Sequence, residues 1–173
     1  MNKQILFMVL VFSLIGCSSE DPKKTMSMKD MKEDLMDANR ILRQKESDAI
    51  DAKVRNMGWK MTTSGTGLRY MFEEHGTGDS AVSGSRAILN YKISLLETGD
   101  ICYSSDSTGP IDFLVGQDYV ETGLHEAIQL MRVGDKAIFI LPSHLAHGLL
   151  GDWEKIPPLA PVVYRIELKE VKK

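Results

Sequence analysis

Two segments of the chain follow a two-residue period, and this pattern constrains the fold more than any other feature of the sequence. In residues 87–95 every odd position is apolar or aromatic, and in residues 162–168 every even position is. A two-residue period is typical of strands that bury one face, as antiparallel sheets do. The apolar runs 111–115 and 136–141 predict further strands. We therefore expect an antiparallel sheet.

A helical period interrupts the predicted strands between residues 122 and 131. Its apolar residues recur at three- and four-residue spacing, namely Leu124, Ala127, Ile128 and Met131. Gly134 follows shortly afterwards and is typical of a helix end. The sequence therefore predicts an α+β fold, in which an antiparallel sheet wraps around one short helix.

The composition fits one globular domain with an appendage. Of 173 residues, 43% are hydrophobic and 26% are charged, a balance that is typical of folded chains. The length excludes a barrel-sized enzyme and a two-domain dinucleotide-binding dehydrogenase. Lysine and arginine total 21 against 24 acidic residues. This balance supplies no basic field, so we expect no nucleic-acid partner.

The first residues resemble the signal peptide of a bacterial lipoprotein. An apolar run too short to span a bilayer precedes Leu14-Ile15-Gly16-Cys17, which has the form of a lipobox. We expect residues 1–16 to be removed and Cys17 to carry lipid that anchors the protein to a membrane, with a flexible tether over residues 17–26. An ordinary secretory signal is the alternative. Lipidation of Cys17 would leave Cys102 without an intramolecular partner, so no disulfide is expected.

A long amphipathic helix is predicted for residues 27–60. Ser27 is a suitable N-cap with Asp30 three residues later, and neither glycine nor proline occurs between Ser27 and Gly58. The apolar stripe of this helix consists of Met28, Met31, Leu35, Ala38, Ile41 and Leu42. Such a stripe could dock on the protein's own domain or form the seam of a weak dimer. A turn-rich segment at residues 62–67 then leads into the main domain.

Several motifs, taken in order, resemble those of the FKBP-type peptidyl-prolyl cis-trans isomerases. They are Val115-Gly116-Gln117, segments 129–137 and 142–148, and Ile156-Pro157-Pro158. The resemblance places the domain at residues 67–173. It implies a twisted antiparallel sheet wrapped around a short α-helix, an apolar hollow for proline-containing polypeptide substrates, and neither cofactor nor metal. The long N-terminal helix is similar to that of lipoprotein members, including ones associated with gliding motility.

The resemblance also implies which residues line the hollow. Positions that keep the family's aromatic or apolar character are Tyr91, Ile111, Ile156 and Tyr164. Val120 and Glu121 match the pair before the helix, where the family holds a substrate carbonyl with the backbone N–H of the second residue. Leu124 stands where the family usually has a tryptophan, and the smaller side chain loses contact worth about 1 kcal/mol.

Other positions of the hollow depart from the family's pattern. Cys102-Tyr103 replaces the usual Phe-Asp, which changes an aromatic wall and a polar anchor. His147 replaces a tyrosine with a shorter ring that titrates near neutral pH. We therefore expect weaker or pH-sensitive catalysis. The residues expected to be catalytic are Tyr91, Leu124, His147 and Tyr164. The residues expected to bind substrate are Cys102, Tyr103, Ile111, Val120, Glu121 and Ile156.

Two other interpretations of these residues are less favoured. His144 and His147 have a spacing that zinc sites use, but their loop has no nearby cysteine and no clear third ligand. Cys102 could be a nucleophile assisted by His125 or His147, but a buried and inert thiol is the commoner role of a free cysteine. We therefore expect no metal site and no covalent chemistry.

Two functions are compatible with these features. The first is a lipid-anchored FKBP-type isomerase that assists the folding of exported proteins at the bacterial cell envelope, with the outer membrane as the expected site and the periplasmic and surface sides both open. The alternative is a non-catalytic chaperone or an assembly subunit of an envelope, motility or secretion complex. The substitutions at Cys102, Tyr103 and His147 motivate this alternative.

Overall fold

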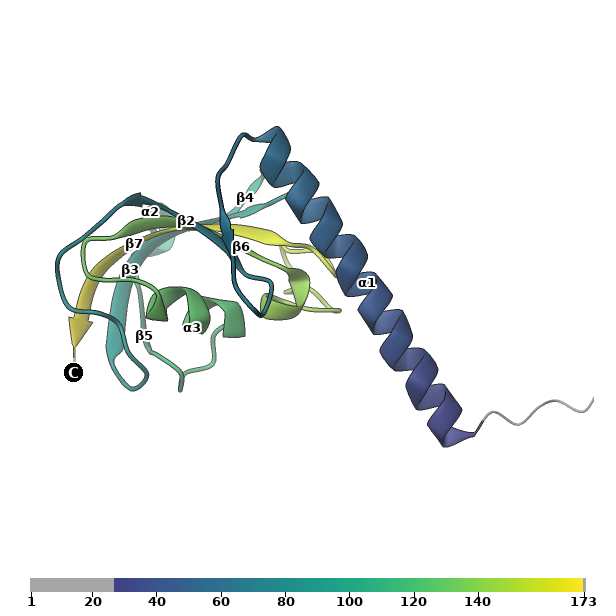
Figure 1. Cartoon of the computed structure of the whole chain (residues 1–173). Coiled ribbons are helices and arrows are strands. Elements are labelled where there is room, and N and C mark those ends of the chain that lie inside the picture. The colour runs from purple at the N-terminus through teal and green to yellow at the C-terminus, as the bar shows by residue number, and fades with distance from the viewer. Residues whose placement is uncertain (1–26, 173) are drawn as a thin grey trace, which may run out of the picture. The chain divides into compact units, whose positions relative to one another are not determined.

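The computed structural model describes residues 27–172 (Figure 1). The chain divides into two units, residues 1–39 and residues 40–173. Helix α1 (Met28–Asn56) runs through the boundary, and every other helix and strand belongs to the second unit. The expected signal peptide, the lipid-bearing Cys17 and the tether lie outside the described residues.

Helix α1 begins where the sequence predicts but ends earlier. The Ser27 hydroxyl accepts a hydrogen bond from the backbone N–H of Asp30 (3.3 Å), and the Ser27 carbonyl accepts one from Met31 (3.0 Å). These bonds confirm the predicted N-cap. The helix stops at Asn56 because Gly58 adopts a φ of 69°, a left-handed conformation that commonly ends helices. None of the described helices has the length and hydropathy needed to cross a membrane.

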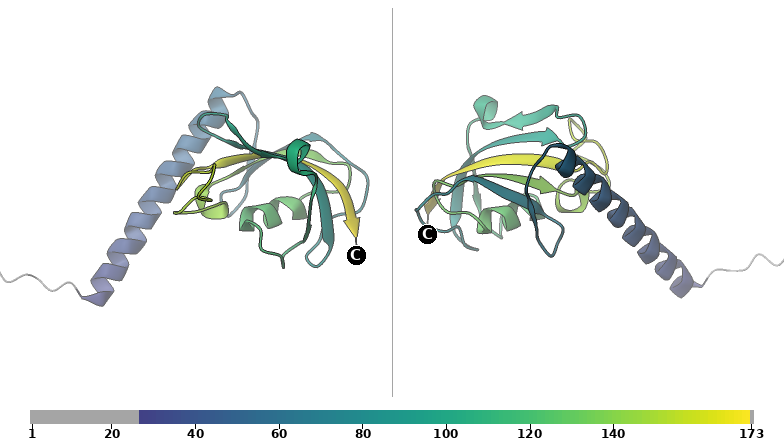
Figure 2. Two further views of the ribbon diagram at one scale, coloured as in Figure 1. Left: turned by 180° about the vertical axis from the view of Figure 1, so that it is seen from behind. Right: turned by 45° about the horizontal axis from the view of Figure 1, so that its top comes forward.

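The described part of the second unit forms a seven-stranded antiparallel sheet that curves around one helix (Figures 1 and 2). The strand order is β1-β2-β6-β7-β3-β4, and β5 also pairs with β3. The strands are β1 (Thr62–Thr63), β2 (Arg69–Glu74), β3 (Arg86–Leu95), β4 (Ile101–Ser104), β5 (Ile111–Leu114), β6 (Lys136–Leu141) and β7 (Val162–Lys172). The remaining helices are α2 (Ser105–Thr108), α3 (Thr122–Gln129) and the 3-10 helix η1 (Ser143–Leu145). This architecture confirms the predicted α+β class.

The main core lies between α3 and one face of the sheet. Strands β3 and β7 form the longest ladder, which runs from Leu95 opposite Val162 to Arg86 opposite Lys172. The residues with the predicted two-residue period that are buried in this core are Ala87, Leu89, Ile93, Val162, Tyr164, Ile166 and Leu168. The α3 residues packed with them are Leu124, Ala127 and Ile128. The sequence periods therefore specify both sides of the core.

A smaller core forms on residues 40–56 of α1. Ile50 is completely buried and packs with Leu96, Ile138, Ile140 and Val163. The contact is made by Ile50 and not by the predicted stripe, whose members Met28, Met31, Leu35, Ile41 and Leu42 are exposed. This part of α1 therefore docks on the sheet, as one of the two predicted alternatives requires.

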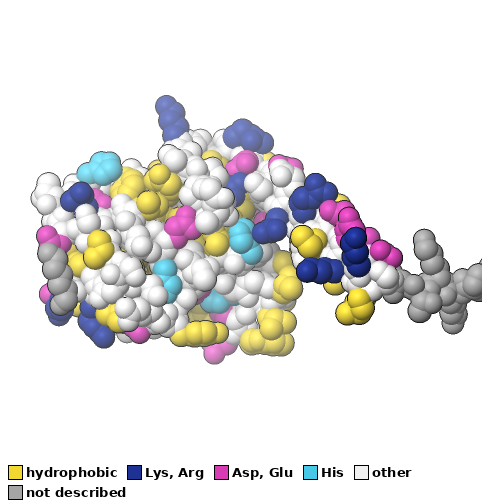
Figure 3. Space-filling view, turned by 60° about the horizontal axis from the view of Figure 1, so that its bottom comes forward, with side chains coloured by type: hydrophobic (Ala, Val, Ile, Leu, Met, Phe, Trp, Pro, Cys, Tyr) yellow, Lys and Arg dark blue, Asp and Glu magenta, His cyan; other side chains and the backbone are white. Residues whose placement is uncertain are grey.

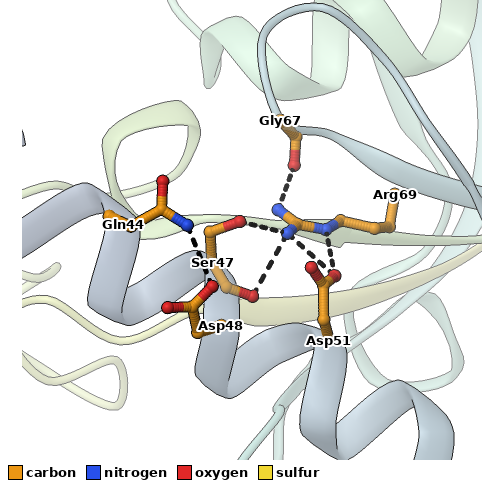
Figure 4. Close-up of polar contacts among 6 residues, drawn as sticks. All are labelled: Gln44, Ser47, Asp48, Asp51, Gly67 and Arg69. Atoms are coloured by element: carbon orange, nitrogen blue, oxygen red, sulfur yellow. Dashed lines mark hydrogen bonds and ion pairs between the residues drawn. The ribbon is translucent and has the colours of Figure 1, made fainter.

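Arg69 on β2 joins the strand to α1 through a group of hydrogen bonds, the Arg69 network (Figure 4). The Arg69 side chain is 3% exposed. It donates hydrogen bonds from Nε and Nη2 to Asp51 Oδ1 (3.1 and 2.9 Å), and from Nη2 to Ser47 Oγ (2.6 Å). Nη1 also bonds the carbonyl of Gly67 (2.6 Å). A buried cation is stable only when its donors are satisfied in this way.

We predict that Arg69→Met destabilises the folded protein by about 1–3 kcal/mol, because the hydrogen-bond partners on α1 lose a buried donor set. Urea unfolding of the two proteins measures this difference. Arg86→Met is the matched control, since Arg86 pairs with Asp112 at 2.7 Å but both side chains are about half exposed. Exposed pairs contribute little. Equal destabilisation by the two substitutions would contradict a stabilising role for the Arg69 network.

Candidate functional site

The residues predicted to line the hollow come from β3, β4, β5, β7, the start of α3 and the loop that precedes β7. Four of them are buried in the main core, namely Cys102, Leu124, Ile156 and Tyr164. Four more are partly buried and pack against that core, namely Tyr91, Tyr103, Ile111 and Val120. On the face of the molecule where α3 lies, histidine side chains lie among exposed hydrophobic side chains (Figure 3). The structure thus gathers these eight residues around one apolar cluster.

The start of α3 is fixed by a close approach that only glycine permits. A Cβ at Gly123 would lie 2.7 Å from Leu141 Cγ and 2.8 Å from the carbonyl oxygen of Leu145. Glu121 is the N-cap, and its carbonyl accepts hydrogen bonds from Leu124 (2.9 Å) and His125 (3.2 Å). The backbone N–H of Glu121 has no hydrogen bond within the described residues. It is therefore a free donor next to Leu124.

His125 holds the loop that leads into α3. Its Nδ1 accepts a hydrogen bond from the backbone N–H of Gly116 (2.8 Å), and its Nε2 lies 3.0 Å from the carbonyl of Asp118. Because Nδ1 accepts, the proton of the neutral ring is assigned to Nε2, which donates to Asp118. Both ring nitrogens are therefore occupied. His125 is a structural residue and does not activate Cys102.

Glu121, His147 and Tyr164 bring three polar side chains together at the hollow. His147 Nε2 lies 3.0 Å from Glu121 Oε1, and the two side chains are 22% and 18% exposed. The contact has an ion-pair distance but lacks the alignment of a hydrogen bond. The Tyr164 hydroxyl is buried near the Glu121 carboxylate, and among the described residues it makes no well-aligned hydrogen bond. Burial raises the pKa of Tyr164, and the Glu121 carboxylate raises it further, so the phenol stays a neutral donor.

Asp152 organises the loop that carries Ile156. Its Oδ1 accepts hydrogen bonds from the backbone N–H groups of Glu154 (2.9 Å), Lys155 (2.9 Å) and Ile156 (2.8 Å). Its Oδ2 accepts a short hydrogen bond from the Tyr103 hydroxyl. Tyr103, which was expected to alter a polar anchor, thus supplies a new one that ties β4 to this loop.

The hydrogen bonds and charges around this loop shift the pKa values of Asp152 and Tyr103. Burial works against ionisation of Asp152, but the hydrogen bonds from Tyr103 and three backbone N–H groups outweigh it and hold the pKa of Asp152 well below its usual range. Because the Tyr103 hydroxyl donates a hydrogen bond to that carboxylate, the pKa of the Tyr103 phenol is raised. Sequence reasoning missed Asp152. The available signal was an aspartate four residues before Ile156, since aspartate side chains favour turns in which they accept hydrogen bonds from the backbone N–H groups that follow.

Cys102 and His144 have ordinary structural roles. The Cys102 thiol is buried, and burial together with the nearby Asp152 carboxylate raises its pKa, which disfavours the reactive thiolate. Its backbone carbonyl accepts a hydrogen bond from Lys155 Nζ (3.0 Å). His144 Nε2 lies 3.2 Å from the carbonyl of Thr66. Within residues 27–172 no three potential ligands gather into a metal site.

Comparisons with known proteins identify relatives of this architecture. Residues 78–169 match the FKBP-type peptidyl-prolyl cis-trans isomerase family. Peptidyl-prolyl cis-trans isomerase FPR2 of Saccharomyces cerevisiae is 40% identical over 93 residues, which cover 53% of this chain and 69% of FPR2. The FKBP-type peptidyl-prolyl cis-trans isomerase FkpA of Escherichia coli is 29% identical over 135 residues, which cover 73% of this chain. The chain spans 49% of the length of that FkpA.

Solved structures show the same fold. The crystal structure of a peptidyl-prolyl cis-trans isomerase from Pseudomonas syringae superposes with a TM-score of 0.63 at 27% identity, and covers 75% of this chain and 96% of that one. The crystal structure of FkpA from Escherichia coli gives a TM-score of 0.64 at 25% identity, and covers 86% of this chain and 74% of that one. Both comparisons include most of the chain.

We predict that Tyr103→Phe destabilises the protein by about 1 kcal/mol near pH 7, a low value for a hydrogen bond to a charged group because solvent reaches the pair. Since the pKa of Asp152 is lowered by folding, its stabilisation is complete above about pH 4 and is lost as the pH falls toward the folded pKa. Urea unfolding should show a smaller difference between wild type and variant at about pH 3. Tyr119→Phe, which alters a fully exposed tyrosine, is the control, and a Tyr103 variant as stable as this control would refute the anchor.

Proposed function

Because this chain belongs to the family of FKBP-type peptidyl-prolyl cis-trans isomerases, we propose that its hollow accelerates rotation about Xaa-Pro bonds and so assists the folding of exported proteins at the bacterial cell envelope. The substrates of such isomerases are proline-containing polypeptides. The observation that carries the proposal is the free backbone N–H of Glu121 beside the buried apolar floor of Leu124 and Tyr164.

The hollow suits an isomerisation that needs no covalent step. Rotation of the amide crosses a barrier of about 18–20 kcal/mol, because the planar bond must lose its resonance. The twisted amide is less polar than the planar one, so an apolar surface that excludes water favours it. In this proposal the proline ring lies against Tyr164 and Leu124, Tyr91 and Ile111 form the wall, and the Glu121 N–H holds a carbonyl of the substrate.

The rest of the site positions the substrate. Ile156 covers the hollow from the loop that Asp152 organises, and Tyr103 keeps that loop in place. Val120 and Cys102 complete the apolar lining. His147 offers a ring nitrogen near Glu121, where it can act on the same substrate carbonyl. The resemblance assigned Ile156, Val120 and His147 to the site, whereas the link from Tyr103 to the Ile156 loop is particular to this chain.

The envelope location rests on the N-terminal sequence. The lipobox-like segment ending at Cys17 supports a lipid anchor, and a tether over residues 17–26 would separate the anchor from α1. The outer membrane is the proposed site, on its periplasmic or its outer side. The exposed residues Met28, Met31 and Leu35 on α1 suit the proposed weak dimer seam.

Binding without catalysis is a second candidate, favoured by an apolar hollow of about 510 Å³ outside the isomerase site. It lies between residues 42–53 of α1 and the loops around Leu96 and Leu159. An exposed apolar hollow of this size is suited to an apolar peptide segment. A chaperone or assembly subunit could hold its partner there.

We predict that the purified chain, at substoichiometric amounts, accelerates the proline-limited refolding of a model protein. Uncatalysed isomerisation takes tens of seconds, which leaves a clear window. Tyr164→Ala should abolish the acceleration, and Tyr91→Ala should lower it about tenfold, since each removes aromatic contact with the proline ring. Tyr70→Ala removes a half-buried tyrosine of β2 and serves as the control for general destabilisation. No acceleration by the folded wild-type chain would rule out the proposed catalysis.

The second candidate function predicts that one substitution can remove client binding without changing isomerisation. Ala49→Glu places a charge in the hollow beside α1 and should abolish any suppression of client aggregation while leaving proline-limited refolding unchanged. Light scattering of an unfolded client measures the first quantity. If wild type and Ala49→Glu suppress aggregation equally, the hollow beside α1 is not the binding site.

A further inference from the structure

Glu121 places a carboxylate at the start of α3, next to the buried apolar cluster that contains Leu124 and Tyr164. Its side chain is 18% exposed and does not cap α3. His147 Nε2 approaches Oε1 at 3.0 Å, and the buried Tyr164 hydroxyl lies near the same carboxylate. A carboxylate that is mostly withdrawn from water is costly to maintain unless cations or donors surround it. This arrangement points to a partner that arrives with the substrate.

The Tyr164 hydroxyl belongs to the same polar cluster. It is buried, with 1% of the residue exposed, and within the described part of the chain it has the Glu121 carboxylate as a polar neighbour but no well-aligned hydrogen bond. Buried hydroxyls are normally hydrogen-bonded, so an exception at a binding surface calls for a ligand. Glu121 is the charged group that acts on this phenol most directly. The unsatisfied polar atoms therefore lie at the same side of the hollow.

The charges around the hollow are mostly negative. Asp152 and Glu154 both accept a hydrogen bond from the Tyr103 hydroxyl, which is part of the wall. Lys155 is committed to the carbonyl of Cys102 and to the face of the Tyr103 ring, 4.8 Å from its centroid. Together with Glu121, the residues at or next to the proposed site include three carboxylates and one lysine. The local field favours a cationic ligand.

We propose that the isomerase site selects Xaa-Pro peptides in which Xaa is lysine or arginine, with the Glu121 carboxylate as the partner of the cation. The inference rests on the proposed function, because the Glu121 N–H then holds the substrate and puts its own side chain within one residue of the rotating bond. A lysine or arginine side chain packs its methylene groups on the apolar wall and carries its charge to the carboxylate. A glutamate at Xaa meets like charge and is disfavoured.

The test compares the full chain's kcat/KM on three peptides that differ only at Xaa, which is lysine, leucine or glutamate. We expect lysine to exceed glutamate by about tenfold at low ionic strength, and the ratio to fall by about half or more in 0.5 M NaCl, because screening weakens such pairs. Glu121→Gln should reduce the ratio to within about twofold of one. A ratio that survives Glu121→Gln, or a wild type that treats lysine and glutamate alike, would overturn the inference.

Glu126→Gln is the matched control. Glu126 lies on the same helix, but its carboxylate accepts hydrogen bonds from Thr66 Oγ1 at 2.9 and 2.7 Å. This substitution removes the same charge from α3 and should leave the lysine-to-glutamate ratio unchanged. A ratio that falls equally in both variants would show that net charge, and not the Glu121 site, sets the preference.

The leucine peptide separates the two proposals. Its turnover tests the isomerase function alone, since leucine has no charge. If the chain isomerises none of the peptides, the proposed function fails, and equilibrium binding of the lysine and glutamate peptides, followed by NMR, then tests selection directly. Tighter binding of the lysine peptide that is lost in Glu121→Gln would support the inference, and equal binding of both peptides would refute it.

Discussion

The close packing of α3 against the sheet determines the geometry of the whole site. Gly123 permits this approach, because any larger residue would collide with Leu141 and the carbonyl of Leu145. The contact puts Leu124 into the main core with Tyr164 and leaves Glu121 at the helix start with a free backbone N–H. The buried contact of α3 thus places an apolar surface, formed by Leu124 and Tyr164, next to the free backbone N–H of Glu121.

Much of this fold could be predicted because it follows from local periodicity. The two-residue period specified β3 and β7, and the helical period specified α3, since each burial pattern can be recognised within ten residues. Strand β2 and the short β4 were not predicted. The β2 sequence contains no regular alternation, and the pairing of β4 with β3 depends on the turn between them and on contacts with the loop before β7. Such strands are specified by tertiary contacts.

The candidate site, like the fold, could be predicted only in part from the sequence. The resemblance to a family identified the residues that the structure gathers, from Tyr91 to Tyr164, because their order along the chain is preserved. It could not supply the bond between Tyr103 and Asp152, which joins residues 49 positions apart and uses side chains particular to this chain. Nor could it show that Ile50, rather than the stripe near Met31, docks α1 on the sheet. Both contacts require knowledge of which surfaces face each other.

The polar side chains of the hollow imply a compromise between rate and selection. A purely apolar hollow favours the twisted amide because that state is less polar than the planar one. A carboxylate in the position of Glu121 works against this advantage, because it keeps polarity and water near the rotating bond, and His147 Nε2 lies 3.0 Å from it. A basic residue before the proline would neutralise the carboxylate and exclude water on binding. On this proposal, Glu121 would disfavour catalysis on an uncharged peptide and favour it on a cationic one, which would couple the choice of substrate to the rate.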